Sequence, residues 1–308
     1  MAFPALAPAA LSSHRPQLSD ALFRQFAALI YRLSGIRFET AKSYFLASRI
    51  NTRVHALGLG GFQAYLAYLG TPQGKAEHAL LINEITINET FFFRHQPQLQ
   101  AFQNDILIPL VAARRAQNQP TFRILSAGAS SGDELYTIAL MLKNLGLAAG
   151  ATRFELIGVD ISQSAVQKAN AAVYRNYNVR NVPPALLRQY FTASGGTQAS
   201  PGARAWALKP EIRKMCRFQQ GNLMDAACTA ALGTFDIIFC RNLLIYFDEA
   251  SKQQVTANLA AMLANDGFVL FGHSENIANQ RHILHADPAH AAAIAYVKTT
   301  PGTSLASA

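Results

Sequence analysis

An apolar strand pattern, a glycine-rich turn and the start of a helix follow one another in residues 122–134, Phe-Arg-Ile-Leu-Ser-Ala-Gly-Ala-Ser-Ser-Gly-Asp-Glu. A short apolar run bounded by glycines is typical of a buried strand, and the helix start after it offers N–H groups to a ligand. The next predicted strand, residues 154–159, leads into Asp160, which could bind both hydroxyls of a ribose. The pattern therefore predicts a ligand site at the carboxyl edge of a parallel sheet.

The glycine turn differs from the common phosphate-binding loops, because it has neither G-x-G-x-x-G nor G-x-x-x-x-G-K-[ST]. Asp133 and Glu134 instead place two carboxylates at the start of the helix. Those carboxylates would repel a phosphate but suit a cationic ligand, and S-adenosylmethionine carries both an ammonium and a sulfonium. An ordinary tight turn, whose acids are stabilised by the helix dipole, is the alternative.

Strands and helices alternate in the second part of the chain, which is typical of a mostly parallel sheet with helices on both faces. Strands are predicted at 122–127, 154–159, 235–240 and 267–272, and helices at 133–144, 164–172 and 251–264. Glycines, prolines and short apolar alternations break this rhythm in residues 183–218. That stretch is predicted to be a small insertion, either a β-hairpin or a three-stranded sheet.

The first part of the chain is predicted to be helical, because apolar residues recur there at helical spacing. Helices are expected at 19–34, 40–57, 62–69 and 77–87, and a linking helix at 98–116. The expected organisation is a helical N-terminal domain at 18–95 and an α/β domain at 96–298. The Ala/Pro-rich residues 1–17 and the tail 299–308 are expected to be flexible.

The composition narrows the class of protein. Half of the residues are hydrophobic, which excludes a globally disordered chain. A secretory signal and a run of about 18 apolar residues are both missing from the sequence, so no membrane insertion is expected. Cys216, Cys228 and Cys240 form no C-x-x-C pair, and the histidines near the C-terminus show no zinc spacing. We therefore expect no metal and a reducing, cytoplasmic location.

A formal net charge of +9 indicates an anionic partner, which could be nucleic acid, an acidic membrane surface or an acidic protein. Lys42, Arg49 and Arg53 fall on one side of the predicted helix 40–57, next to its apolar stripe. We call these three residues the basic ridge. A solvated helix face without a partner is the alternative.

Two further segments place polar side chains where a ligand could use them. Arg241 and Asn242 come directly after the predicted strand 235–240, where polar groups are costly unless they bind something. An arginine paired with a surface acid is the alternative. Residues 88–94, Asn-Glu-Thr-Phe-Phe-Phe-Arg, would bury two rings and leave one charge pointing outward. The alternative for this segment is an aromatic plug between domains.

Together these segments resemble the CheR family of chemotaxis receptor methyltransferases over roughly residues 20–298. Residues 88–94 look like the family's N-x-T-x-F-F-R, and residues 129–136 are similar to its A-S-T-G-E-E-P-Y. Further similarities are G-V-D-I-S at 158–162, G-N-L at 221–223, F-C-R-N-L-L-I-Y-F at 239–247 and G-H-S-E at 272–275. Asp133 and Leu135 depart from the family's Glu and Pro.

The resemblance implies a Rossmann-like S-adenosylmethionine-dependent methyltransferase domain with a small β-subdomain insertion, preceded by an all-α N-terminal domain. It implies methyl esterification of glutamate side chains on the cytoplasmic helices of chemotaxis receptors, with S-adenosyl-L-homocysteine as product. By resemblance, Arg94 and Tyr246 are the candidate catalytic residues. The implied cofactor-binding residues are Asn88, Thr90, Arg94, Ala129, Glu134, Asp160, Asn222, Leu223, Arg241 and Asn242.

The implied partner is the acidic helical region of a methyl-accepting receptor, and the basic ridge is the surface expected to bind it. Some family members grip a receptor C-terminal pentapeptide with the β-subdomain through a tight turn. The loop at 194–210 is longer here, so we do not expect that tether. We expect a monomer that binds no nucleic acid.

Two alternatives remain open from the sequence. A nucleic-acid methyltransferase would suit the positive charge, but the [DN]-P-P-[YF] loop of amino-group methylation is missing after the strand that precedes Arg241. A catalytically inactive S-adenosylmethionine-binding adaptor is the other alternative. The joint presence of Thr90, Arg94, Asn242 and Tyr246 argues against it.

Overall fold

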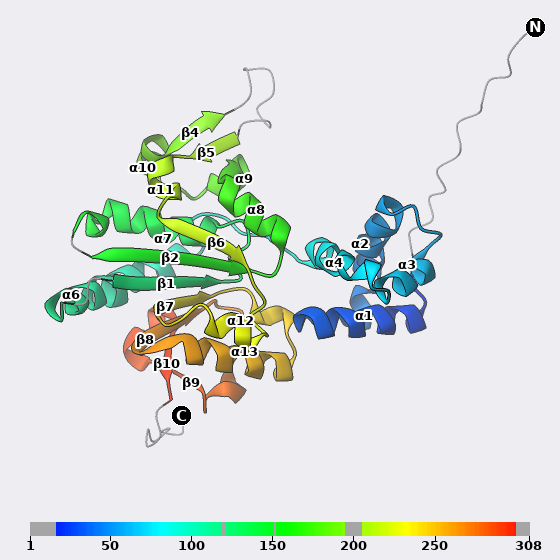
Figure 1. Cartoon of the computed structure of the whole chain (residues 1–308). Helices are drawn as coiled ribbons and strands as arrows, with labels where there is room; N and C mark the ends of the chain where they lie inside the picture. The colour runs from blue at the N-terminus through cyan, green and yellow to red at the C-terminus, as the bar shows by residue number, and fades with distance from the viewer. Residues whose placement is uncertain (1–16, 119–120, 151, 195–204, 300–308) are drawn as a thin grey trace, which may run out of the picture. The chain divides into compact units, whose positions relative to one another are not determined.

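The computed structural model describes residues 17–118, 121–150, 152–194 and 205–299, and these form two units (Figure 1). Unit 1 comprises the chain up to Leu29 and Phe38–Ile85, and unit 2 comprises Ile30–Arg37 and the chain from Thr86 onward. The ends expected to be flexible lie, except for residues 17 and 299, outside the described residues. No helix in the described ranges is both long and apolar enough to span a membrane.

Unit 1 is helical, as its apolar spacing predicts. Its helices are α1 (Asp20–Ser34), whose last turn belongs to unit 2, α2 (Ser43–Ala56), α3 (Phe62–Leu69) and α4 (Glu77–Ile85), with short 3-10 turns at Thr40–Lys42 and Gln73–Lys75. The core contains Phe26 and Tyr65, whose rings stack with centroids 6.1 Å apart. Arg53 reaches into this core, where its Nε lies 2.7 Å from Glu77 Oε1.

Seven strands of the described chain form one sheet in unit 2, in the order β6-β2-β1-β7-β8-β10-β9. Their bounds are β1 (Thr121–Ala127), β2 (Arg153–Asp160), β6 (Cys216–Gln220), β7 (Phe235–Cys240), β8 (Leu263–Phe271), β9 (Leu284–Ala286) and β10 (Ala295–Lys298). The first five strands of that order run parallel, and β10 runs antiparallel to both β8 and β9. The predicted parallel sheet is therefore confirmed, with an antiparallel edge.

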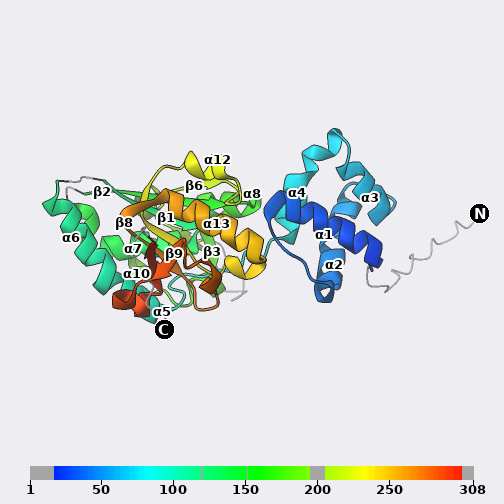
Figure 2. The same cartoon turned by 90° about the horizontal axis from the view of Figure 1, so that it is seen from below.

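The alternation of side chains along β1 divides the core into two layers. Phe122 and Ile124 belong to one buried cluster, whereas Leu125 and Ala127 belong to the other. This is the period of two that a strand buried on both faces must show. The first cluster includes residues of α5 (Gln96–Ala101), α7 (Asp133–Asn144) and α8 (Gln163–Ala171), and the second includes residues of α13 (Glu249–Met262). Figure 2 shows α5 and α13 on opposite sides of the strands.

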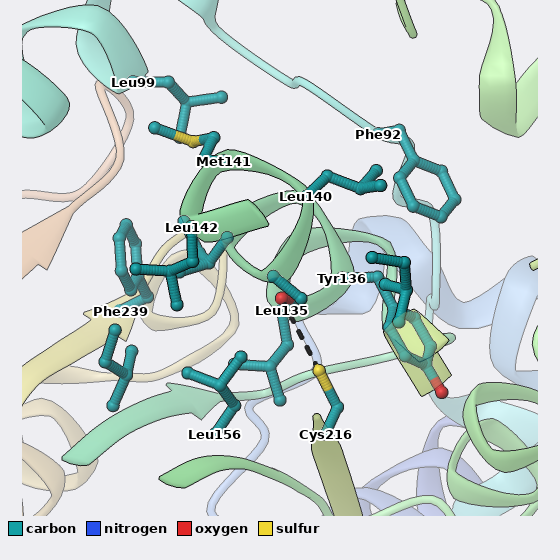
Figure 3. Close-up of a cluster of buried hydrophobic side chains, with 14 of the residues drawn as sticks. Phe92, Leu99, Leu135, Tyr136, Leu140, Met141, Leu142, Leu156, Cys216 and Phe239 are labelled. Atoms are coloured by element: carbon teal, nitrogen blue, oxygen red, sulfur yellow. Dashed lines mark hydrogen bonds between the residues drawn. The ribbon is translucent and has the colours of Figure 1, made fainter. Parts of the chain in front are cut away.

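Helix α7 is the centre of the first cluster (Figure 3). All its residues from Leu135 to Leu142 are buried, so apolar side chains surround it on every side. Cys216 lies against it, where its buried thiol donates its S–H to the Leu135 carbonyl at 3.8 Å. Because α7 is fixed in this way, the residues at its N-terminus have a fixed position at the sheet edge.

A smaller antiparallel sheet, formed within the described residues by β3 (Val173–Arg175), β5 (Ala205–Leu208) and β4 (Phe191–Ser194), makes the β-subdomain together with α9 (Asn176–Val179) and α10 (Pro184–Tyr190). The prediction of a small β insertion is confirmed in the second of its two forms, the three-stranded sheet, but its bounds of 183–218 are wrong at both ends. The subdomain begins with β3, and β6 pairs in parallel with β2 of the large sheet. Most of the loop judged long, residues 195–204, lies outside the described ranges.

Two other segments differ from the sequence-based expectation. The helix predicted to reach residue 87 ends at Ile85, and residues 86–95 form a non-helical segment of unit 2 rather than part of the helical domain. The linking helix contains π-helical turns at Phe102–Leu107, between α5 and α6 (Ile108–Ala116). The remaining helices of unit 2 are α11 (Pro210–Arg213) and α12 (Ala226–Ala230), with short 3-10 turns at Leu147–Ala149, Leu244–Tyr246, Ala278–Gln280 and Pro288–Ala293.

A buried ion pair between α6 and β7 gives a stability prediction. Asp236 Oδ1 accepts from Arg114 Nε at 2.9 Å, and its Oδ2 accepts from the Arg123 backbone N–H at 2.7 Å. Asp236→Ala leaves a buried guanidinium without its buried partner, so we expect it to lower the free energy of unfolding by about 3 kcal/mol. Urea titration followed by fluorescence of Trp206, the single tryptophan, measures this.

Asp266→Ala is the matched control, because Asp266 also pairs with Arg114 but its side chain is 57% exposed. An exposed ion pair contributes about 1 kcal/mol at most. Equal losses from the two variants would contradict the role given to Asp236.

Candidate functional site

The carboxyl ends of five parallel strands bring the predicted polar residues to one edge of the sheet. β1 pairs with β2 on one side and with β7 on the other, so the chain changes direction across the sheet at β1. In open α/β sheets a ligand binds at such a switch point, outside the carboxyl ends of the strands. The turns that follow β1, β2 and β7 therefore define the candidate site.

The glycine turn, residues 128–132, is bound tightly to β2. The backbone N–H groups of Gly128 and Ala129 both donate to the Val159 carbonyl at 2.9 Å. Gly132 has a φ of 85°, and a Cβ there would lie 2.8 Å from the Phe218 ring. Both the backbone conformation and the space require glycine at this position.

Asp160 is the link between this turn and the end of β2. Its Oδ2 accepts from the Ser130 N–H and its Oδ1 from the Ser162 N–H, both at 2.8 Å. Burial raises the pKa of Asp160, and the two backbone hydrogen bonds act in the opposite direction. Each carboxylate oxygen can accept more than one hydrogen bond, so the side chain is still compatible with ribose hydroxyls.

The two acids at the start of α7 have different environments. Asp133 is fully buried and accepts from Ser131 Oγ at 2.6 Å and from Asn178 Nδ2 at 3.0 Å. Burial raises its pKa to about 6. The idea that both carboxylates face a cation is therefore wrong for Asp133, because consecutive helical residues point about 100° apart. Glu134 stays at the edge, where it accepts from Ser126 Oγ at 2.9 Å.

Arg241 connects β7 to two other parts of the edge. Its Nη1 donates to Glu134 Oε2 at 3.1 Å and its Nη2 donates to the Arg94 carbonyl at 2.8 Å. Its Nε is buried and has no hydrogen-bond partner within the described part of the chain. Arg241 is thus paired with an acid, as the alternative interpretation of the sequence proposed. However, its two partners, Glu134 and the Arg94 carbonyl, both lie within the candidate site.

The turn after Arg241 is strained and is held by an acid that the sequence analysis did not single out. Asn242 has a φ of 59°, and the next N–H, of Leu243, donates to Glu275 Oε1 at 2.8 Å. Burial raises the pKa of Glu275, against the backbone hydrogen bonds that it accepts. Leu243 then lies against Gly128, where a Cβ would meet its side chain at 3.2 Å. The G-H-S-E motif was the signal that could have identified Glu275.

Residues 88–94, called here the signature segment, lie against the glycine turn and the β-subdomain. The Asn88 carbonyl accepts from Ser130 Oγ at 2.9 Å, and the Phe93 N–H donates to Thr137 Oγ1 at 3.0 Å. Phe92 is fully buried and Phe93 nearly so, as predicted. The Phe92 ring packs edge-on against Tyr174 at a centroid distance of 4.8 Å. These contacts bring Asn88, Thr90 and Arg94 into the site region.

Arg94 and Tyr246 come from different segments of unit 2, but the charge of Arg94 affects the pKa of the Tyr246 phenol. Arg94 Nη1 donates to the Glu89 carbonyl at 3.2 Å, and its guanidinium carbon lies 5.5 Å from the Phe91 ring centroid. Burial raises the pKa of the Tyr246 phenol, while the positive charge of Arg94 opposes that rise. The phenol therefore stays protonated at neutral pH, and it lies within electrostatic range of Arg94.

The remaining predicted residues lie partly near the sheet edge of unit 2 and partly in unit 1. Asn222 uses its amide within the protein, donating to the Leu33 carbonyl and accepting from the Met224 N–H, both at 3.0 Å. Leu223 and Ala129 are buried near the ends of β6 and β1. The basic ridge lies in unit 1, with Lys42 and Arg49 exposed and Arg53 paired to Glu77. The described ranges contain no cluster of side chains suited to hold a metal ion.

Comparison with known proteins agrees with this geometry. The family model "CheR methyltransferase, SAM binding domain" matches residues 88–291, and "CheR methyltransferase, all-alpha domain" matches residues 21–86. "Chemotaxis protein methyltransferase 2" of Vibrio cholerae is 34% identical over 270 residues, covering 87% of this chain and 90% of that protein. "Chemotaxis protein methyltransferase" of Salmonella typhimurium is 33% identical over 268 residues, covering 87% and 88%.

The first family match begins at the signature segment and includes the glycine turn, Asp160 and Arg241. S-adenosylmethionine is therefore the cofactor of unit 2, whose matched range contains the candidate cofactor residues Glu134, Asp160 and Asn242. With its methyltransferase domain and its all-α domain both matched, this chain belongs to the CheR methyltransferase family.

Proposed function

We propose that this protein transfers a methyl group from S-adenosylmethionine to glutamate side chains on the cytoplasmic helices of chemotaxis receptors, as part of sensory adaptation. The relatives of similar sequence are named chemotaxis protein methyltransferases. The observation that carries the proposal is the Arg241 guanidinium, which donates both to Glu134 and to the Arg94 carbonyl and so ties Arg94 to the candidate cofactor residues. The Tyr246 phenol lies within electrostatic range of Arg94. A cation and a neutral hydrogen-bond donor are the groups that a carboxylate substrate requires.

The reaction needs no general base, because a glutamate side chain is already ionised at neutral pH. A carboxylate oxygen attacks the methyl carbon in line, and the electron pair of the breaking carbon–sulfur bond stays on sulfur. Two opposite charges disappear, so water stabilises the reactants more than the transition state. A site that excludes water and aligns oxygen, carbon and sulfur therefore accelerates the transfer.

Arg94 is suited to position the carboxylate without suppressing its reactivity. Part of its hydrogen-bonding capacity goes to the Glu89 carbonyl, and its charge lies over the Phe91 ring. We therefore expect a weaker ion pair with the substrate than a fully free guanidinium would make. Tyr246 would orient the same carboxylate through its O–H.

Receptor docking is proposed for the exposed part of the basic ridge, Lys42 and Arg49. Arg49 lies over the Phe45 ring, 5.1 Å from its centroid. Arg53 differs, because Glu77 neutralises its charge and Tyr65 Oη also donates to that carboxylate at 2.9 Å. We assign Arg53 chiefly to the core of unit 1 and the other two residues to the acidic partner.

The decisive experiment is incorporation of tritiated methyl groups from S-adenosylmethionine into receptor-containing membranes and, in parallel, into RNA. The proposal expects base-labile label in the receptors and none in RNA, because carboxyl methyl esters hydrolyse in base. Label in RNA would support the nucleic-acid alternative. Cofactor binding without label in either would support the inactive adaptor.

Arg94→Ala and Tyr246→Phe should each lower kcat for receptor methylation, by roughly 100-fold and 10-fold respectively, because the carboxylate is no longer held in line. Binding of S-adenosylhomocysteine, measured by calorimetry, should change little. Unchanged turnover in both variants would remove these residues from the chemistry.

Asp160→Ala should weaken S-adenosylhomocysteine binding by about tenfold or more, since it removes a candidate ribose acceptor and the tie between Ser130 and Ser162. Asp160→Asn keeps the volume and one acceptor oxygen, so its loss should be smaller. Full affinity of the alanine variant in calorimetry would contradict the assignment.

Replacing Lys42 and Arg49 together by Gln should weaken receptor association, most strongly at low ionic strength, because screening reduces the contribution of exposed charges. Binding to receptor membranes at low and high salt measures this. The control is Arg53→Gln, which should chiefly lower the stability of unit 1. If the double variant binds normally at both salt concentrations, the ridge is merely solvated surface.

A further inference from the structure

The short helix α9 of the β-subdomain holds the middle of the signature segment. Asn178 Nδ2 donates to the Thr90 carbonyl at 3.2 Å and lies 3.0 Å from Asp133 Oδ1. The Asn178 carbonyl accepts from the Phe92 N–H at 3.0 Å. One residue thereby connects the signature segment, the start of α7 and the subdomain.

A stack of side chains on the same surface adds a second connection. The Arg180 guanidinium lies 3.5 Å from the Phe91 ring centroid and 3.8 Å from that of Tyr177. Tyr177 Oη donates to Glu89 Oε1 at 2.5 Å. The guanidinium carbon of Arg94 also lies over the Phe91 ring, 5.5 Å from its centroid. Arg180 therefore fixes the ring over which the candidate catalytic charge lies.

These contacts matter because the signature segment has no regular structure of its own. It is non-helical, and Phe93 within it and His95 directly after it adopt positive φ angles of 54° and 61°, which are uncommon for such residues. Ser130 and Thr137 hold its two ends. The contacts of α9 fix the part between them, which includes Thr90 and Phe91.

We propose that Asn178 and Arg180 are positioning residues for methyl transfer, which hold the signature segment so that Arg94 presents its charge to the substrate carboxylate. Neither residue touches the reacting atoms in this scheme. The inference rests on the proposed function, in which Arg94 binds the substrate carboxylate. It makes the β-subdomain part of the catalytic structure, independently of any receptor tether.

The test compares Asn178→Ala, Arg180→Ala and Arg180→Lys with the control Arg188→Ala, an exposed arginine on α10 of the same subdomain. Steady-state methylation of receptor membranes gives kcat and KM, and calorimetry gives the S-adenosylhomocysteine affinity. Hydrogen exchange of a peptide covering residues 88–95 reports directly on the signature segment. Thermal unfolding checks that each variant is folded.

We expect kcat to fall about tenfold in Asn178→Ala and about threefold to tenfold in Arg180→Ala, with affinity for S-adenosylhomocysteine within twofold of wild type. Arg180→Lys should recover part of the loss, because an ammonium also binds an aromatic face. Exchange in residues 88–95 should be faster in both alanine variants. Arg188→Ala should match wild type in every measurement.

The inference is overturned if folded Asn178→Ala and Arg180→Ala keep wild-type kcat and wild-type exchange. It is equally overturned if the variants lose only thermal stability and affinity for S-adenosylhomocysteine, while kcat and exchange in residues 88–95 stay at wild-type values. That result would indicate a general structural role. A wild-type protein that binds S-adenosylhomocysteine but methylates no receptor refutes the proposed function instead. In that case the exchange measurement alone decides whether Asn178 and Arg180 hold the segment.

Discussion

The buried guanidinium of Arg241 is the contact on which the arrangement of the sheet edge depends. It joins the end of β7 to Glu134 at the start of α7 and to the backbone of Arg94. Removing one partner of a buried charge leaves the other uncompensated, which is strongly unfavourable. The three segments are therefore held together, and the candidate cofactor residues on them keep one relative position.

The proposed transfer of a methyl group to a carboxylate would place an unusual demand on such an edge. Charges disappear along the reaction, so a site with many free charged groups would stabilise the reactants and slow the transfer. In this protein many of the polar groups near the glycine turn are satisfied internally. Asp160 accepts two backbone N–H groups, Asp133 accepts from Ser131 and Asn178, and Glu134 pairs with Arg241. The internal pairing agrees with the proposal that Arg94 and Tyr246 are the groups that meet the substrate.

The burial of Asp133 has an energetic cost. Its pKa rises from 3.8 to about 6, so between these values the folded state binds more protons than the unfolded state. The contribution of this group to the free energy of unfolding therefore falls as pH rises through that window and is constant above it. Hydrogen bonds from Ser131 and Asn178 limit the cost. An asparagine in the β-subdomain thus supports the ionised form of an acid in the large sheet unit.

The sequence could predict the elements whose pattern is local. The strands β1, β2 and β7 are rich in apolar residues, and the polar residues at their ends had to meet at one edge because the strands are parallel. β6 has the mixed pattern Cys-Arg-Phe-Gln-Gln at the edge of the sheet, so it could not be distinguished from the insertion. β3 is three residues long, which is too short for any periodicity.

Contacts between side chains that are distant in sequence could not be predicted from local patterns. The spacing of Arg53 placed it on the basic ridge, but its partner Glu77 comes from another helix, and only packing brings them together. The same holds for Asn178, whose contacts reach Thr90 and Asp133. Such pairings depend on the tertiary fold, whereas Asp160 and Arg241 could be located because they stand at the end of a strand or directly after it.

The attachment of the β-subdomain shows why it cannot act as a separate appendage. Tyr174 of β3 packs against Phe92 of the signature segment, and its hydroxyl donates to the Ser131 carbonyl of the glycine turn at 2.8 Å. The Phe92 ring also meets Phe191 of β4 at 5.3 Å. A displacement of the subdomain would therefore also displace the glycine turn and the signature segment. Because these contacts are buried and interlocked, any partner that binds the subdomain acts on a structure already continuous with the site of methyl transfer.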